Sequence, residues 1–390
     1  MYTLRKSLML LAVICLVSCQ KTGIHRNDVQ ELSFSRPSTL KLTKSQTEMT
    51  KGVNDFTYKI FKETLTDKDI FISPFSISIA LSMLTTGADG DTEQQLLSAL
   101  GFEEKTTEDL DAYYSAVIKN MTSSDPETTL NIANAIWSRR DISLQSQYVS
   151  DCKKYFDSVV ESVDFTDPST IQKINDWTKE KTKGKIEKLI ETISPRTSAI
   201  LTNALYFKAT WALKFWRSGN RMVAKAKTAY FEGDGFTAVL LPYGNGTFAM
   251  RIIQPDKDKK LGDVISKLDE LSEMSGETAI VSLNLPVFSF TYENHLNDAL
   301  KNLGIKDAFL EEKADFSKMS SEKLYLGDVF HKTFIDVNEN GTEAAAATVV
   351  SMFGNAVPTR EMEFKVERDF IFEIIDRSSG ITIFIGLHKM

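Results

Sequence analysis

A run of four alanines near the C-terminus is the sequence feature that most restricts how this chain of 390 residues can fold. It lies in the stretch 339–356, which reads ENGTEAAAATVVSMFGNA, between apolar segments with the pattern of strands. Consecutive alanines favour a helix, and an Ala-rich surface helix or loop tip is one interpretation. If the stretch is instead a strand, every second side chain from Thr342 to Met352 lies on one face, and these side chains are small at first and then more apolar. Such a strand could enter the middle of a sheet with little steric resistance. Gly341, directly before it, allows a positive φ and therefore suits a hinge.

This stretch resembles the proximal hinge of the reactive-centre loop in inhibitory serpins, whose pattern is Glu, any residue, Gly, Thr or Ser, Glu and then alanines. Further motifs that resemble serpin sequences are SPFSISIALSML at 73–84, TNALYFKATW at 202–211 and FIG at 384–386. The resemblance extends from about Thr50 to Met390, nearly the whole chain after its N-terminal segment. It implies a mixed α/β serpin fold with three β-sheets, about nine helices and an exposed reactive-centre loop at about 339–362, in a single domain over 46–390.

The resemblance implies a protease inhibitor that acts as a suicide substrate. A target protease cleaves the loop and forms an acyl-enzyme, and the freed hinge then inserts as a strand into the main sheet before water releases the protease. The hinge residues implied are Glu339, Gly341, Thr342, Glu343, Ala344, Ala345, Ala346, Ala347 and Thr348. The inserting part, Gly341–Thr348, carries no bulky residue and no proline, which favours an inhibitor over a non-inhibitory serpin.

The family's usual spacing from the hinge places the scissile bond between Asn355 and Ala356. Cleavage after Gly354 or after Ala356 stays open, because the segment beyond the bond is slightly longer than the pattern implies. The small residues near the bond favour an elastase-like serine protease as the target. Phe353 would suit a chymotrypsin-like protease, and Asn355 would suit an Asn-specific cysteine protease.

Four polar residues in apolar surroundings need hydrogen-bond partners, since a buried polar group is nearly always paired. They are Ser73 and Ser76 in a helical pattern, Asn203 in the most apolar strand pattern, and His331 at the start of another. Helix capping would explain the serines, and a satisfied core histidine would explain His331. The serpin resemblance assigns all four to the shutter, a hydrogen-bonded cluster that holds two central strands together, and it places Trp211 in the breach, where the loop first enters the sheet.

The first 18 residues have the pattern of a signal peptide, with Arg5 and Lys6 before a short apolar run. The run ends in LVSC, which resembles the lipobox of bacterial lipoproteins and predicts lipidation of Cys19 after cleavage. A plain secretory signal with a chance cysteine is the alternative. Residues 19–45 are polar and rich in turn formers, which predicts a flexible tether. We therefore expect an exported protein with a lipid anchor on the outer membrane, either on its periplasmic side or at the cell surface.

Composition and missing motifs restrict the other function classes. The net charge of −7, without a basic patch, argues against nucleic-acid binding. No Cys/His cluster or HExxH motif is present, so we expect no metal and no cofactor. An exported hydrolase using His331 is disfavoured because no GxSxG elbow is present, so we do not expect an enzyme. A surface lipoprotein with a structural or adhesive role remains an alternative, and we expect a monomer.

Overall fold

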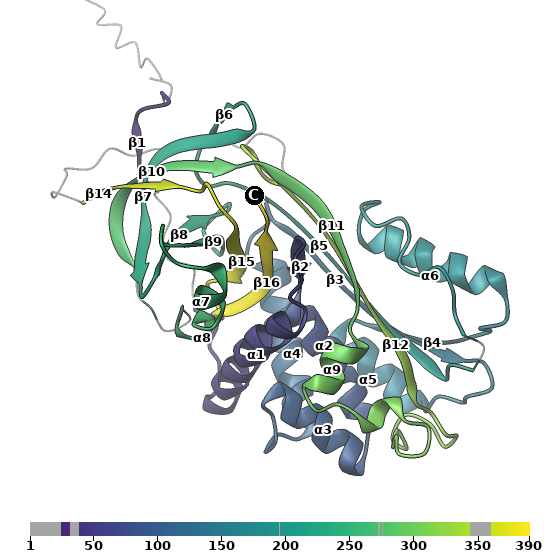
Figure 1. Ribbon diagram of the computed structural model, residues 1–390. Helices are drawn as coiled ribbons and strands as arrows, with labels where there is room; N and C mark the ends of the chain where they lie inside the picture. The colour runs from purple at the N-terminus through teal and green to yellow at the C-terminus, as the bar shows by residue number, and fades with distance from the viewer. Residues whose placement is uncertain (1–24, 32–38, 195, 272–273, 275, 344–359) are drawn as a thin grey trace, which may run out of the picture.

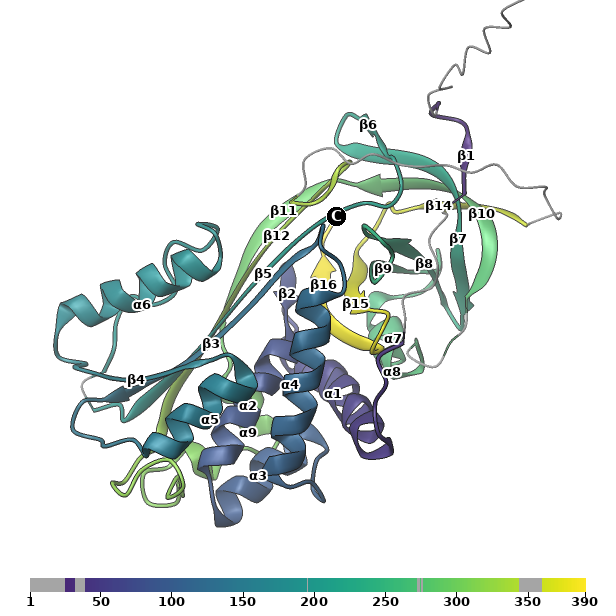
Figure 2. The ribbon, with the colours of Figure 1, turned by 180° about the vertical axis from the view of Figure 1, so that it is seen from behind.

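The computed structural model describes residues 25–31, 39–194, 196–271, 274, 276–343 and 360–390 (Figure 1). The helices are α1 (Lys44–Glu63), α2 (Pro74–Gly87), α3 (Gly90–Leu100), α4 (Thr107–Ser123), α5 (Ser146–Phe156), α6 (Pro168–Lys181), α7 (Leu261–Ile265), α8 (Leu268–Leu271) and α9 (Asn297–Asn302). Figures 1 and 2 show α1 to α5 and α9 gathered at one end, with α6 alone on the opposite side of the long strands. The nine helices of the described residues agree with the number implied by the resemblance.

The strands are β1 (Val29–Gln30), β2 (Ile70–Ile72), β3 (Thr129–Arg139), β4 (Val159–Val163), β5 (Ala199–Thr210), β6 (Trp216–Ser218), β7 (Arg221–Gly233), β8 (Phe236–Pro242), β9 (Phe248–Pro255), β10 (Glu277–Pro286), β11 (Phe288–His295), β12 (Leu326–Asn338), β13 (Gly341–Thr342), β14 (Glu361–Lys365), β15 (Phe370–Asp376) and β16 (Ile381–His388). A six-stranded sheet has the order β11-β12-β13-β5-β3-β4. In its centre β12 and β5 run parallel and pair directly, except where β13 lies between their ends.

The remaining strands form one hydrogen-bonded sheet of ten strands, in which β7 connects two groups of strands. The first part of β7 pairs with β6 and β1, its last part pairs with β8, and β10 lies along its other edge. Because β7 is 13 residues long, it links two strand groups. The second and third sheets implied by the resemblance are therefore continuous through β7.

Helix α2 is the central helix of the domain because its sequence is apolar nearly all round. Of its residues only Thr86 is not buried. Pro74 occupies its first turn, and the Ser73 side chain accepts a hydrogen bond from the Ser76 N–H at 3.3 Å. This N-cap fixes both serines beneath the six-stranded sheet.

Part of the predicted tether is docked on the domain. Val29 and Gln30 form β1 parallel to β7, and Gln30 is 1% exposed. Its side-chain amide donates to the Lys214 carbonyl at 2.9 Å and accepts from the Lys214 N–H at 2.8 Å. This pairing corrects the prediction of a flexible segment for residues 25–31. It depends on a partner 184 residues away in the chain.

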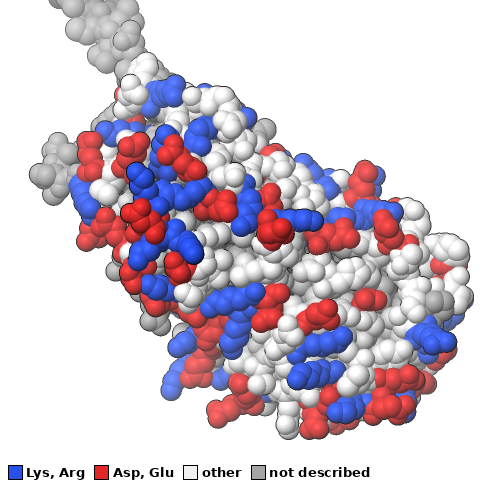
Figure 3. All heavy atoms as spheres, viewed as in Figure 1, with Lys and Arg blue, Asp and Glu red and all other residues white. Residues whose placement is uncertain are grey.

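Charged residues of both signs are interspersed over the face in Figure 3. Exposed charged side chains of the described residues also pair across elements, such as Arg360 with Glu232 at 2.7 Å. Pairs of this kind contribute little to stability, on the order of 0–1 kcal/mol each. The stability of the domain therefore rests on its apolar core.

Candidate functional site

Two residues of the predicted hinge lie between the ends of β12 and β5. Gly341 and Thr342 form β13, which pairs antiparallel with Asn338 and Val337 on one side and with β5 on the other. Gly341 has φ 151°, in the region that favours glycine. Thr342 is 2% exposed, and its hydroxyl lies 2.6 Å from the Tyr243 hydroxyl. Gly341 and Thr342 are therefore already part of the six-stranded sheet.

Glu343 directly follows β13 and has a different backbone conformation. Its backbone has φ 55°, the left-handed conformation, which is uncommon for a residue other than glycine. Its N–H donates to the Asp336 carbonyl at 2.9 Å, and its carboxylate lies 3.3 Å from the Lys185 ammonium. Burial raises the pKa of the Glu343 carboxyl, while Lys185 opposes this shift. The contact with Lys185 fixes the chain where it leaves the sheet.

Trp211 lies at the mouth of the same gap. Its indole stacks on the Tyr243 ring with centroids 4.3 Å apart, and its Nε1 donates to the Asn338 carbonyl at 2.8 Å. Its backbone N–H donates to the Asn340 carbonyl at 3.0 Å. Glu339, the first residue of the predicted hinge, pairs with Arg217 at 2.9 Å. The turn that precedes β13 is therefore held by side chains that follow β5.

The four predicted shutter residues are brought together beneath β5 and β12. The His331 Nε2 accepts from the Ser73 N–H at 3.2 Å, so its Nδ1 carries the proton and donates to the Asn203 Oδ1 at 2.6 Å. The Asn203 Nδ2 donates to the Ser76 hydroxyl at 2.5 Å. His331 and Asn203 are also register partners in the parallel pair of β12 and β5. Their hydrogen bond therefore joins the two strands between which the hinge lies.

Asn134 of β3 is a fifth member of this cluster that the sequence reasoning missed. Its Oδ1 accepts from the Asn203 Nδ2 and from the Ser76 hydroxyl, the latter at 3.5 Å. It is 1% exposed. The signal was present, because Asn134 stands among apolar residues in a strand pattern just as Asn203 does.

Residues 51–389 match the family model described as Serpin (serine protease inhibitor). The chain belongs to the serpin family. An uncharacterized serpin-like protein of Thermococcus kodakarensis is 34% identical, over 90% of this chain and 89% of its own. The thermophilic serpin tengpin in its native state superposes with a TM-score of 0.79 at 30% identity, over 94% of this chain and 98% of tengpin. Human thyroxine-binding globulin gives a TM-score of 0.78 at 25% identity, over 88% of this chain and 98% of its own.

This serpin has the mixed α/β fold that the sequence predicted. Membership of the family supports protease inhibition as the general function, with a protease as the kind of partner, and serpins are generally inhibitors rather than enzymes. Within the described part of the chain, no group of three or more His, Cys, Asp or Glu side chains is arranged to hold a metal ion. The helices described there include none that is both long and apolar enough to cross a bilayer.

Some predicted site residues lie outside the described residues. They are the lipidation site Cys19, the later hinge residues Ala344, Ala345, Ala346, Ala347 and Thr348, and Phe353, Gly354, Asn355 and Ala356 around the predicted scissile bond.

This serpin is expected to become less stable as the pH is lowered below about 6.5, because of His331. Burial lowers the pKa of His331 from 6.5 to about 3. Between these two pH values the imidazole is therefore neutral in the folded protein but protonated in the unfolded chain. The free energy of unfolding therefore decreases as the pH falls from 6.5 towards 3, by about 1.4 kcal/mol per pH unit for this one group. Denaturant unfolding at several pH values, compared between the wild type and His331→Gln, measures the effect. Equal pH slopes in the two proteins would contradict it.

Proposed function

We propose that this serpin is an exported suicide inhibitor of a serine protease. The target cleaves the loop near Asn355–Ala356 and becomes acylated, and residues up to Thr348 then insert between β12 and β5. The observation that carries the proposal is β13, because Gly341 and Thr342 already pair with both strands at the start of this path. An inserting strand gains hydrogen bonds on both edges.

The register of β13 indicates where further residues would arrive. Thr342 lies opposite Val337 of β12 and Ala209 of β5. Because β13 is antiparallel to both strands, each later residue of the loop would lie opposite the residue one position earlier in each strand. If the loop continued in this register, Thr348 would lie opposite His331 and Asn203, which are partners in the β12–β5 pair. Thr348 shares the inward face of Thr342 at a period of two, so its hydroxyl would meet the two shutter side chains as they separate.

We also propose that the protein is anchored to the outer membrane through lipidated Cys19. The docked segment supports an anchor close to the loop. Val29 pairs with Lys225, Lys225 with Ser282 and Ser282 with Glu363, so β1 lies three strands, or roughly 14 Å, from β14 after the loop. The ten residues from Cys19 to Val29 span at most about 35 Å. The target protease would therefore be met close to the membrane surface.

Mass spectrometry of the mature N-terminus, together with membrane fractionation, tests the anchor. We expect a lipidated Cys19 as the first residue and recovery of the protein with the outer membrane. An unmodified N-terminus on a protein released into the medium would contradict the anchor. It would leave the inhibitory proposal untouched.

Incubation of the domain with elastase-, chymotrypsin-, trypsin- and papain-like proteases tests the inhibition. We expect a denaturant-resistant complex with an elastase-like serine protease and a released C-terminal peptide that begins at Ala356. The mass of that peptide identifies the cleaved bond. Cleavage of the loop by every protease without a covalent complex would contradict inhibition and favour a non-inhibitory serpin.

A further inference from the structure

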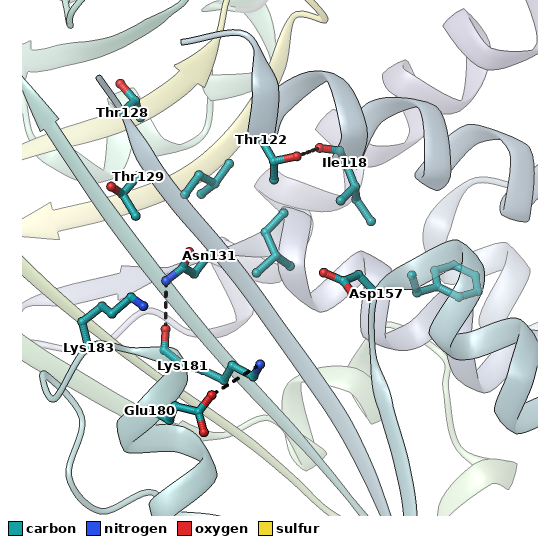
Figure 4. Close-up of a pocket in the computed structure, with 12 residues that line it drawn as sticks. Ile118, Thr122, Thr128, Thr129, Asn131, Asp157, Glu180, Lys181 and Lys183 are labelled. Carbon is teal, nitrogen blue, oxygen red and sulfur yellow. Dashed lines mark hydrogen bonds and ion pairs between the residues drawn. The ribbon is translucent and has the colours of Figure 1, made fainter. Parts of the chain in front are cut away.

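The segment that follows α6 crosses the face of the six-stranded sheet on which α6 lies, the α6 face. It is attached to β3 where the Asn131 Nδ2 donates to the Lys181 carbonyl at 3.2 Å (Figure 4). It is attached to β12 where the Lys332 ammonium donates to the Lys188 carbonyl at 2.7 Å. Lys185 lies between these two attachments along the chain, so the segment carries it across the α6 face from β3 to β12.

The ion pair between Lys185 and Glu343 is partly shielded from water. The Lys185 ammonium lies 3.3 Å from the Glu343 carboxylate and 5.0 Å from the centroid of the Phe334 ring of β12. The Glu343 side chain is only 3% exposed, so its charge is screened less than that of a surface residue. Because a buried carboxylate is unfavourable without a cation beside it, Lys185 stabilises the hinge in this position.

The backbone of Glu343 is already half in register with the sheet. Its N–H donates to the Asp336 carbonyl at 2.9 Å, which is the ladder hydrogen bond that follows the pairing of Thr342 with Val337. Its φ of 55° then turns the chain away from β12 and β5. This conformation is unfavourable for a residue other than glycine. Insertion requires φ to return to the extended region, and that rotation moves the side chain relative to Lys185.

The register of β13 predicts where the Glu343 side chain would arrive. In a strand continued from Thr342, Glu343 lies opposite Asp336 of β12 and Lys208 of β5. Thr342 and its partner Ala209 are buried on the core side, so alternation places Glu343 and Lys208 together on the α6 face. Residues directly opposite each other on neighbouring strands have Cβ atoms roughly 5 Å apart, within reach of a glutamate and a lysine.

Lys208 has the charge and the exposure needed to receive this carboxylate. Its side chain is exposed, whereas Phe207 and Ala209 on either side of it are buried. In the part of the chain that the structure describes, Lys208 takes part in no ion pair. On the other edge, Asp336 would set a second carboxylate opposite Glu343, and like charges in this arrangement repel. An inserted Glu343 therefore needs a cation on the β5 side, and Lys208 is placed to supply it.

We propose that Glu343 exchanges Lys185 for Lys208 when the loop inserts. Lys185 holds the hinge in the position seen in the structure, and Lys208 holds the carboxylate beside the inserted strand and offsets the charge of Asp336. Lys208 is thus a positioning residue for the inhibitory reaction, although the sequence offers no motif that marks it. This inference rests on the proposed function, because it requires the loop to enter between β12 and β5.

The crystal structure of the mature protein, after cleavage of its loop and removal of the protease, tests the exchange. We expect the Glu343 carboxylate within about 4 Å of the Lys208 ammonium, and no contact between Glu343 and Lys185. An inserted loop with Glu343 still paired with Lys185, or directed into solvent, would overturn the proposal. A cleaved loop that stays outside the sheet would instead be a failure of the proposed function.

Reaction with an elastase-like serine protease, followed by denaturing gel electrophoresis, tests the effect of Lys208 on the rate of insertion. The ratio of cleaved inhibitor to covalent complex rises when insertion slows relative to deacylation. We expect Lys208→Glu to raise this ratio about threefold or more, because a third carboxylate then faces Glu343 and Asp336. Lys208→Arg keeps the charge and should give the wild-type ratio. Lys119→Glu, an equal change of charge at an exposed position of α4, should also give the wild-type ratio.

A charge swap separates this role from a merely structural one. Glu343→Lys combined with Lys208→Glu restores an opposite pair, and we expect the ratio to return to within about twofold of the wild type. An unchanged ratio in Lys208→Glu, an equal rise in Lys208→Arg, or a charge swap that performs no better than Lys208→Glu would overturn the proposal. Absence of any covalent complex with the wild type would again be a failure of the proposed function.

Discussion

Thr342→Arg is expected to turn this serpin from an inhibitor into a substrate of its target protease. Thr342 is 2% exposed between β12 and β5, and its hydroxyl contacts Tyr243 at 2.6 Å. An arginine on this inward face must take a guanidinium into the core, which costs several kcal/mol without a partner. Insertion then becomes slower than deacylation, so water releases the protease. We expect the number of inhibitor molecules consumed per protease molecule to rise about tenfold or more, since 1.4 kcal/mol already changes a rate ratio tenfold.

Glu343→Gln is the matched control for this variant. It changes the next hinge residue, whose side chain contacts Lys185 outside the β12–β5 gap, without adding bulk. We expect its stoichiometry to stay close to that of the wild type. Titration of a fixed amount of protease with each protein gives the stoichiometry, and gel electrophoresis under denaturing conditions separates complex from cleaved inhibitor. A stoichiometry near that of the wild type for Thr342→Arg would show that inward residues of the hinge do not have to enter the sheet.

The sequence alone predicted the parts of this serpin that depend on local pattern. The positive φ of Gly341, the cluster of Ser73, Ser76, Asn203 and His331, and the place of Trp211 beside the turn before β13 all follow from motifs in short segments. The capped, apolar helix α2 likewise follows from Pro74 and the residues around it. In each case the residue type requires a particular conformation or partner, such as a positive φ or a hydrogen-bond partner for a buried hydroxyl, and the structure supplies it.

Features that depend on distant partners could not be predicted. Gln30 is polar and lies in a polar segment, and only the Lys214 backbone, brought beside it by the fold, explains its burial. The depth of hinge insertion is similarly a balance between non-local contacts. Thr342 gains pairing with β12 and β5, while Glu343 leaves the sheet to reach Lys185. Small residues after Gly341 indicate that a strand can form, but they do not determine where it stops in the uncut loop.

Cleavage of the loop is expected to raise the melting temperature of this serpin by about 10 °C or more. Among the described residues, Gly341 and Thr342 are the ones that pair with both β12 and β5 at this end of the strands. After cleavage the chain from Glu343 to Thr348 is free to continue the same register between β12 and β5. Six further residues paired on both edges supply hydrogen bonds worth about 1 kcal/mol each, together with burial of alanine side chains. A total near 10 kcal/mol corresponds to a shift of about 10 °C or more at this chain length, because the entropy of unfolding is about 0.8 kcal/mol/K.

Thermal unfolding of the intact and loop-cleaved domain measures this shift, and Thr342→Arg again supplies the comparison. If insertion follows the register of β13, the cleaved wild type gains stability and the cleaved variant gains much less, because its strand cannot pass the buried arginine. If the cleaved wild type has the same melting temperature as the intact protein, β12 and β5 do not separate after cleavage. The inhibitory mechanism would then be contradicted as well. If the cleaved wild type is more stable but traps no protease, the inserted state is favourable but forms more slowly than water releases the protease. The inhibitory mechanism would then fail because insertion is too slow.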